Sequence, residues 1–254
     1  MNWNPTWICP ANDLGDPPAV FGTSFVFEKK ITHANLTITA MGVYEARLNG
    51  RRVGQFVMAP GWTSYHKRLQ YQEYDITALL TNGKNGIEVT VGKGWYRSPL
   101  PGWLGCAYQD ELRSRPCGLA AQITLTFEDG SSKILSTDES WKVSDGPVRF
   151  SEIYDGEIYD SAKTPLLDQP VTIFDGPTDT LILQQGEEVC EQERLAVKKV
   201  FVTPNGETVL DFGQNMTGYV ELFVNAKAGD CVDLSFAEVM DKEGNFYTEN
   251  YRGA

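Results

Sequence analysis

The chain has 254 residues, of which 41% are hydrophobic and 22% charged, and this length allows one large or two modest globular domains. Its net charge of −12 repels phosphate backbones and excludes nucleic acid as a partner. No apolar run approaches the roughly 20 residues of a membrane span, and the first residues lack the basic and apolar segments of a secretory signal, so we expect a cytoplasmic protein with no membrane partner.

Cysteine and histidine usage argues against metal sites and nucleophilic catalysis. The five cysteines are widely spaced and form no CxxC or His–Cys cluster, which argues against zinc. We expect them to be free thiols in a reducing compartment. The two histidines, His33 and His66, are far apart in sequence, which argues against histidine-assisted catalysis.

Period-two alternation of apolar residues dominates the chain and predicts short strands. Turns that contain Gly or Asn separate them, for example Asn49-Gly50 and Pro204-Asn205-Gly206. A short helical turn is expected to end within Ala78–Leu80. The predicted strands, in chain order, are Ser24–Phe27, Ala34–Ala40, Val43–Leu48, Leu69–Tyr74, Gly86–Val91, Gly118–Phe127, Ser132–Thr137, Val171–Phe174, Leu181–Gln184, Leu195–Phe201, Thr208–Asp211, Gly218–Asn225 and Cys231–Glu238.

Strands of this length and spacing are typical of β-sandwiches, so the predicted fold class is all-β, with two jelly-roll-like sandwiches in tandem. Prolines cluster at Pro165, Pro170 and Pro177, where long apolar runs are few. We therefore expect a first sandwich over residues 1–160 and a second, smaller one over residues 161–254.

Several motifs of the first half follow one another in a characteristic order. They are the hairpin 44–54 with its Asn49-Gly50 turn, segment 59–65, segment 68–72, Tyr74–Thr77 and segment 92–96. Together they resemble the N-terminal, galactose-binding-like domain of bacterial α-L-rhamnosidases, glycoside hydrolase family 78.

The resemblance continues in segments 151–160, 211–218 and 237–252, which are similar to the second β-domain of the same family. In that family the chain continues into an (α/α)6 barrel that carries the acidic catalytic residues. The resemblance therefore implies a non-catalytic accessory β-region, truncated before the barrel and inactive alone, whose partner is the barrel of the parent chain.

The aromatic loop Gly94–Gln109 is a candidate sugar site. Trp95, Tyr96 and Trp103 could stack on the apolar faces of a sugar, with Arg97 fixing hydroxyl groups. The alternative is that these tryptophans fill the end of the sandwich or pack on the barrel. A second aromatic group, at Trp62 and its neighbours Tyr65, Arg68 and Tyr71, is interpreted as fastening a long loop to the sheet.

The resemblance adds Asn49 to this site, because some N-terminal modules of the family bind L-rhamnose with calcium near the Asn-Gly hairpin and the loop after Gly-Trp-Tyr. Calcium needs about 6–8 oxygen ligands. Residues 97–106 offer few oxygen ligands and place Arg97 among them. We therefore expect no cofactor, with calcium as the open alternative, and rhamnose-containing glycans as a possible partner.

Two further polar motifs are predicted to be structural. Asp155 and Glu157 share one face of an extended strand, about 7 Å apart, a spacing that glycoside hydrolysis would permit but that does not diagnose it. We interpret them as a solvated segment beside the domain boundary. The motif with Asp211, Gln214 and Asn215 carries amides that fix loops, and we expect Glu238 to join the same network.

Three hypotheses follow from the sequence. The first is the accessory region that packs on and supports the catalytic barrel, and it predicts an exposed apolar patch on this chain. The second is a carbohydrate-binding module for L-rhamnose or a related sugar. The third, the least favoured, is a self-sufficient hydrolase that uses Asp155 and Glu157.

Overall fold

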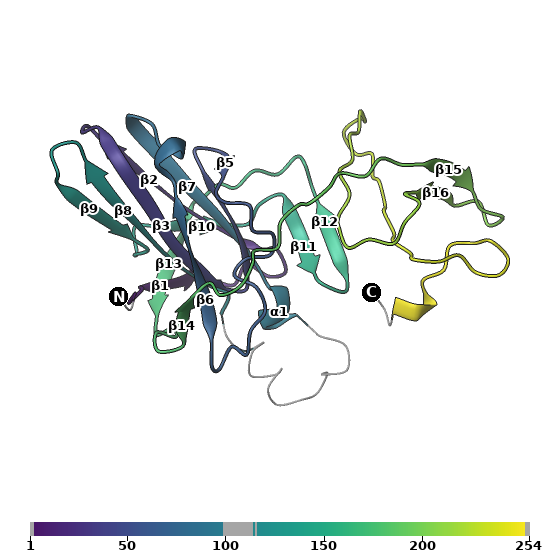
Figure 1. Cartoon of the computed structure of the whole chain (residues 1–254), viewed down its shortest axis with the longest axis horizontal. Coiled ribbons are helices and arrows are strands. Elements are labelled where there is room, and N and C mark those ends of the chain that lie inside the picture. Colours follow the sequence, from purple (N-terminus) through teal and green to yellow (C-terminus); the bar gives the residue numbers. More distant parts are fainter. Residues whose placement is uncertain (1–2, 99–113, 115, 252–254) are drawn as a thin grey trace. The chain divides into compact units, whose positions relative to one another are not determined.

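The computed structural model describes residues 3–98, 114 and 116–251. The chain divides into two compact units, Met1–Glu191 and Gln192–Gly253 (Figure 1). Strands dominate the first unit, and none of the described helices is long and apolar enough to cross a membrane. The expected all-β class is confirmed.

The elements that the structure describes in the first unit are fourteen strands and the single helical turns η1 and α1. Its elements are β1 (Trp7–Pro10), β2 (Ala19–Phe27), β3 (Ile31–Met41), β4 (Val43–Leu48), β5 (Arg51–Arg52), β6 (Leu69–Asp75), η1 (Thr77–Leu79), β7 (Gly83–Gly92), α1 (Gly94–Arg97), β8 (Gly118–Phe127), β9 (Ser132–Ser136), β10 (Lys142–Ser144), β11 (Val148–Glu152), β12 (Gly156–Tyr159), β13 (Gln169–Phe174) and β14 (Leu181–Leu183).

All of these strands except the β11–β12 hairpin belong to one sheet with the order β14-β6-β3-β8-β1-β13-β10-β2-β7-β4-β5, and β9 adds to β8. The sheet curls over itself at β13, which pairs with β1 through one part of its length and with β10 through another. Apolar side chains from both halves of the sheet therefore meet in one core.

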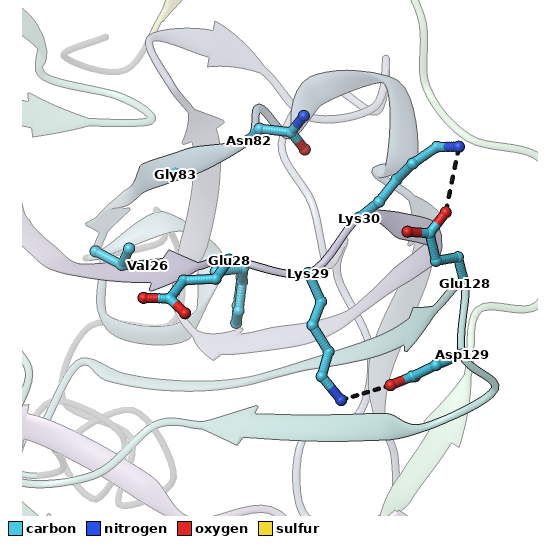
Figure 2. A pocket seen from close by; sticks show the side chains of 9 residues that line it. Val26, Glu28, Lys29, Lys30, Asn82, Gly83, Glu128 and Asp129 are labelled. Atoms are coloured by element: carbon cyan, nitrogen blue, oxygen red, sulfur yellow. Dashed lines mark hydrogen bonds and ion pairs between the residues drawn. The ribbon is translucent and has the colours of Figure 1, made fainter.

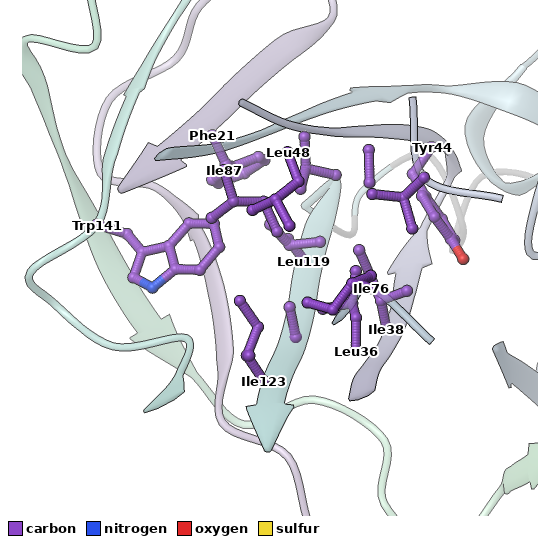
Figure 3. Packing of buried hydrophobic residues seen from close by; sticks show 14 of the residues in the cluster. Phe21, Leu36, Ile38, Tyr44, Leu48, Ile76, Ile87, Leu119, Ile123 and Trp141 are labelled. Atoms are coloured by element: carbon purple, nitrogen blue, oxygen red, sulfur yellow. The ribbon is translucent and has the colours of Figure 1, made fainter. Parts of the chain in front are cut away.

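Alternation along the strands decides which side chains enter this core. Leu36 and Ile38 of β3 face Phe21 of β2 and Ile87 of β7, and all four are at most 1% exposed (Figure 3). The opposite face of β3 and β8 contributes Met41 and Ala120 to a second cluster. That cluster also contains Trp7, Tyr65, Leu69 and Tyr96.

The Asn49-Gly50 turn forms as predicted. Both residues have positive φ, 53° and 76°, which is the conformation of a two-residue type I′ hairpin. The turn lets Leu48 of β4 pair with Arg51 of β5. Asn and Gly are the residues that adopt this conformation at least cost, which is why the Asn-Gly pair predicts the turn from the sequence alone.

The division between the units lies at Glu191/Gln192, whereas the sequence led us to expect 160/161. The physical reason is strand pairing. β13 closes the first sheet, and β14 pairs in parallel with β6 through Leu181–Leu69, so both belong to the first unit. The prolines of this region flank and enter these strands, with Pro170 inside β13.

The second unit has little regular structure. It contains the hairpin of β15 (Lys199–Val202) and β16 (Thr208–Asp211), and the single turn η2 (Glu249–Tyr251). The predicted strands Gly218–Asn225 and Cys231–Glu238 are wrong for the described structure, which gives these residues no strand. A strand needs a paired neighbour for its backbone hydrogen bonds, and alternating apolar side chains alone do not supply one.

Candidate functional site

The candidate site begins where β7 ends. β7 runs to Gly92, and α1 follows at Gly94 with φ +51°. A Cβ atom at Gly94 would lie only 2.5 Å from Cγ1 of Val43, so both the backbone conformation and the space require glycine here. This turn brings Trp95 to the surface immediately beyond the end of the strand.

Trp95 forms an aromatic platform with Trp62, which comes from the long connection between β5 and β6. The two indole rings are stacked, with centroids 6.1 Å apart and an interplanar angle of 8°. Trp62 is 53% exposed and Trp95 is half-buried. Exposed indole faces of this kind stack on the C–H faces of sugars.

The sequence did not indicate that these two tryptophans meet. Each stood in its own motif, Trp62 in segment 59–65 and Trp95 in segment 92–96, and no periodicity links two connections. The interpretation of Tyr65 as a fastener of the long connection fits the structure. Its ring, 5% exposed, packs edge-to-face on Tyr96 with centroids 5.2 Å apart.

Tyr96 and Arg97, both predicted as sugar ligands, turn inward from the platform. Tyr96 is 2% exposed and belongs to the second apolar cluster. Arg97 is half-buried, and its Nη1 donates to Sγ of Cys117 at 3.6 Å. Burial raises the pKa of the Cys117 thiol, and the positive charge of Arg97 opposes that shift.

Asn49 lies at the opposite end of the sheet from the platform. Val43 of β4 pairs with Gly92, and the N–H of Asn49 donates to the carbonyl of Gly86. Gly86 and Gly92 are six residues apart on β7, about 20 Å at roughly 3.3 Å per residue. The structure therefore does not bring Asn49 together with Trp95.

The side chain of Asn49 is occupied by the chain itself. Its Nδ2 donates to the carbonyl of Leu79 at 2.9 Å and to Oδ1 of Asn85 at 2.8 Å. Its Oδ1 accepts from the N–H of Gly86 at 3.0 Å. These bonds fasten the β4–β5 turn to η1 and to the first half of β7.

Trp103 and most of segment 97–106 lie outside the described residues. The structure therefore tests for a metal site only in the rest of the chain. Within residues 3–98, 114 and 116–251, no group of three or more His, Cys, Asp or Glu side chains could hold a metal ion. Calcium binding stays a hypothesis on that part of the loop.

Asp155 and Glu157 lie on the β11–β12 hairpin. Asp155 is in its turn, Glu157 pairs with Ser151 across it, and both side chains are exposed. The other motif belongs to the second unit. There Oδ1 of Asp211 accepts from the N–H of Gly213 at 2.6 Å, while Gln214, Asn215 and Glu238 are exposed.

A broad surface hollow of about 690 Å3 lies among the turns β2–β3, η1–β7 and β8–β9 (Figure 2). Four of its charged side chains pair with one another. Nζ of Lys29 lies 2.6 Å from Oδ2 of Asp129, and Nζ of Lys30 lies 3.5 Å from Oε2 of Glu128. The hydrogen bonds from Lys29 and Ser131 hold the pKa of Asp129 well below its ordinary value, so this carboxyl carries no proton to donate near neutral pH.

Comparison with known proteins agrees with this fold. The family model of the α-L-rhamnosidase N-terminal domain matches residues 29–193, and that of the bacterial α-L-rhamnosidase concanavalin-like domain matches residues 201–254. The gap between the two matches falls close to the division at Glu191/Gln192.

Individual relatives are considerably longer than this chain. An α-L-rhamnosidase of Streptomyces avermitilis is 37% identical over 237 residues, which cover 89% of this chain and 22% of the relative. One from Formosa agariphila is 32% identical, covering 100% of this chain and 29% of the relative.

A crystal structure of the Streptomyces avermitilis α-L-rhamnosidase complexed with L-rhamnose superposes with a TM-score of 0.81 at 33% identity, covering 92% of this chain and 23% of that one. The chain thus spans about a quarter of the length of these relatives. It belongs to the bacterial α-L-rhamnosidase family and corresponds to the N-terminal region of an α-L-rhamnosidase.

Proposed function

We propose that this chain is a non-catalytic accessory region that packs on and supports the catalytic barrel of its parent α-L-rhamnosidase. The observation that carries the proposal is a row of exposed apolar side chains in the second unit. Val232, Leu234 and Phe236 alternate with polar residues and are 55%, 45% and 60% exposed. An exposed apolar row of this kind is a common mark of a surface that another part of a protein covers.

The carboxyl groups give a second line of support. Hydrolysis of a glycoside needs one carboxylic acid that stays protonated near neutral pH and a second carboxylate across the bond. Hydrogen bonds lower the pKa of the carboxyl groups of Asp75, Asp129 and Asp241, which is the opposite of what a general acid needs. Asp155 and Glu157 stand exposed on a hairpin rather than in a cleft.

The test is a pair of matched substitutions in the full-length parent enzyme. Val232→Ser in the apolar row should lower its thermal stability and activity on an aryl α-L-rhamnoside, because a polar hydroxyl would enter the interface. Val26→Ser, at a valine 61% exposed in the first unit, should change neither. Equal behaviour of the two variants, or turnover of the rhamnoside by this chain alone, would overturn the proposal.

A second candidate function rests on the aromatic platform. The stacked pair of Trp62 and Trp95 supports binding of L-rhamnose or a related sugar, for which we expect an affinity on the order of 1 mM. Titration with L-rhamnose, with and without calcium, would be followed by the NMR signals of the tryptophan side chains. Saturable shifts of the Trp62 and Trp95 signals would support sugar binding. The absence of such shifts at about 20 mM sugar would refute this second function.

A further inference from the structure

A narrow slot opens between the two halves of the curled sheet at one corner of the first unit. β10 pairs with β2 only over Val20–Gly22, so in the described part β2 borders an open edge from Thr23 onward. β9 ends the facing half of the sheet, because among the described strands it pairs only with β8. Residues 137–141 cross from one half to the other, and a volume of about 200 Å3 remains beneath them.

The floor of this slot is apolar. Ile87, Ala121, Ile123 and Trp141 line it, and each is at most 5% exposed. Figure 3 shows Trp141 at the margin of the core cluster. The indole N–H of Trp141 already donates to the carbonyl of Ser136 at 3.3 Å, so the floor offers an occupant no hydrogen bond.

The mouth of the slot is mostly polar. Ser24, Ser136, Asp138 and Ser140 lie along it, together with the exposed Ile134. Oδ1 of Asp138 accepts from the N–H of Ser140 at 2.8 Å and from its hydroxyl, which fixes the carboxylate in the 137–141 connection. The second oxygen of this exposed carboxylate is an acceptor at the entrance.

We propose that this slot binds a single aromatic ring that carries a hydroxyl group, a ligand of the phenol class. The ring would lie among Ile87, Ile123 and Trp141, and its hydroxyl would donate to Asp138. The volume sets the size, because an apolar cavity of roughly 150 Å3 is enough to hold benzene, whereas drug-sized ligands need about 300 Å3 or more. A hydrogen bond to a charged acceptor is among the stronger kinds, which suits a phenolic donor.

The same chemistry disfavours a sugar in the slot. A monosaccharide carries hydroxyl groups on most of its ring carbons, and the apolar floor would leave several of them without partners. Each buried hydroxyl without a partner lowers affinity by about tenfold or more. The slot is thus distinct in ligand class from the platform of Trp62 and Trp95, and the proposal does not rest on the function proposed above.

The test is an NMR titration of this chain with phenol that follows the indole N–H of Trp141. We expect a saturable shift of this signal with a dissociation constant on the order of 1 mM. L-rhamnose should leave the Trp141 signal unchanged, even where it shifts the signals of the platform tryptophans. Absence of a saturable shift at about 20 mM phenol would overturn the proposal.

Three variants localise the effect. Thr23→Phe adds a ring at the half-buried Thr23 of the slot and should abolish the shift, whereas Val26→Phe adds the same ring on the same strand outside the slot and should preserve it. Asp138→Asn keeps the acceptor for Ser140 but loses the charge, and should weaken phenol binding by about 3- to 10-fold. Unchanged binding in both Thr23→Phe and Asp138→Asn would refute the assigned site.

Discussion

Lys93 and Glu152 form an ion pair beside the aromatic platform, with Nζ of Lys93 3.4 Å from Oε1 of Glu152. The side chain of Glu152 is only 5% exposed, and its Oε2 has no hydrogen-bond partner. Lys93 precedes α1, which carries Trp95, while Glu152 ends β11 in the 151–160 motif. The pair therefore ties a motif of the second half of this unit to the platform.

Lys93→Met should lower the free energy of unfolding, because it leaves a buried carboxylate without its partner. Breaking a fully buried pair costs about 3–5 kcal/mol, and we expect about 2 kcal/mol because Lys93 is 24% exposed. Urea unfolding would measure the change. Asp16→Asn is the matched control, since Asp16 also contacts Lys93 but is 74% exposed, and its loss should cost at most about 0.5 kcal/mol.

Tyr44 makes the stability of the first unit sensitive to alkaline pH. Its hydroxyl donates to Oε1 of the buried Gln72 at 2.7 Å, and Nε2 of Gln72 donates to Oε1 of Gln184 beside β14. Burial raises the pKa of Tyr44 well above its ordinary value, with a further contribution from Tyr74. The unfolded chain therefore loses this proton first.

The stabilisation from Tyr44 is fully present below about pH 10, the pKa of the unfolded phenol, and is lost as the pH rises above that value. Tyr44→Phe should cost about 1–2 kcal/mol at pH 7, because Gln72 loses its donor. It should also make the fall in unfolding free energy above about pH 10 less steep. Tyr159→Phe is the control, because Tyr159 is 63% exposed. If unfolding free energy fell equally steeply with pH in both variants, this prediction would be wrong.

Most strands of the first sheet could be predicted because their side-chain pattern is local. Val43–Leu48 and Gly118–Phe127 were predicted to the residue, since each alternates between a core face and an outer face. The short strands β1 and β10 were missed. Each is held by partners far away in sequence, as in the pairing of Trp7 with Phe174, and such pairing leaves no periodic signal.

The candidate site was predictable only in part, for the same reason. Sequence motifs indicated Trp95 as an aromatic candidate, but its stacking on Trp62 depends on how two connections converge. The direction in which Tyr96 and Arg97 point depends on the single helical turn α1. A turn this short has no amphipathic pattern, so the sequence did not predict it. Asn49 was grouped with these residues by resemblance, and the register of β4 on β7 separates them.

Asn49→Ala tests whether this residue is structural. The substitution removes three side-chain hydrogen bonds and places alanine at φ 53°, and we expect a loss of about 2 kcal/mol in unfolding free energy. Asn49→Gly tolerates the same backbone conformation and should lose about 1 kcal/mol, from the hydrogen bonds alone. An unchanged stability in Asn49→Ala, accompanied by a lower affinity for L-rhamnose, would assign Asn49 to sugar binding instead.

Trp62→Ala separates sugar binding by the platform from contact of the same surface with the catalytic barrel. Because half of Trp62 is exposed, its removal should change the unfolding free energy of this chain by less than about 1 kcal/mol. If the platform binds sugar, the affinity for L-rhamnose should fall by about tenfold, the worth of one stacked ring, and Trp62→Phe should restore most of it. If instead this surface contacts the catalytic barrel, Trp62→Ala should leave sugar affinity unchanged and lower the thermal stability of the full-length enzyme alone. Calorimetry with L-rhamnose and thermal unfolding of both proteins distinguish these outcomes, because only an interface residue has an effect that depends on the presence of the rest of the enzyme.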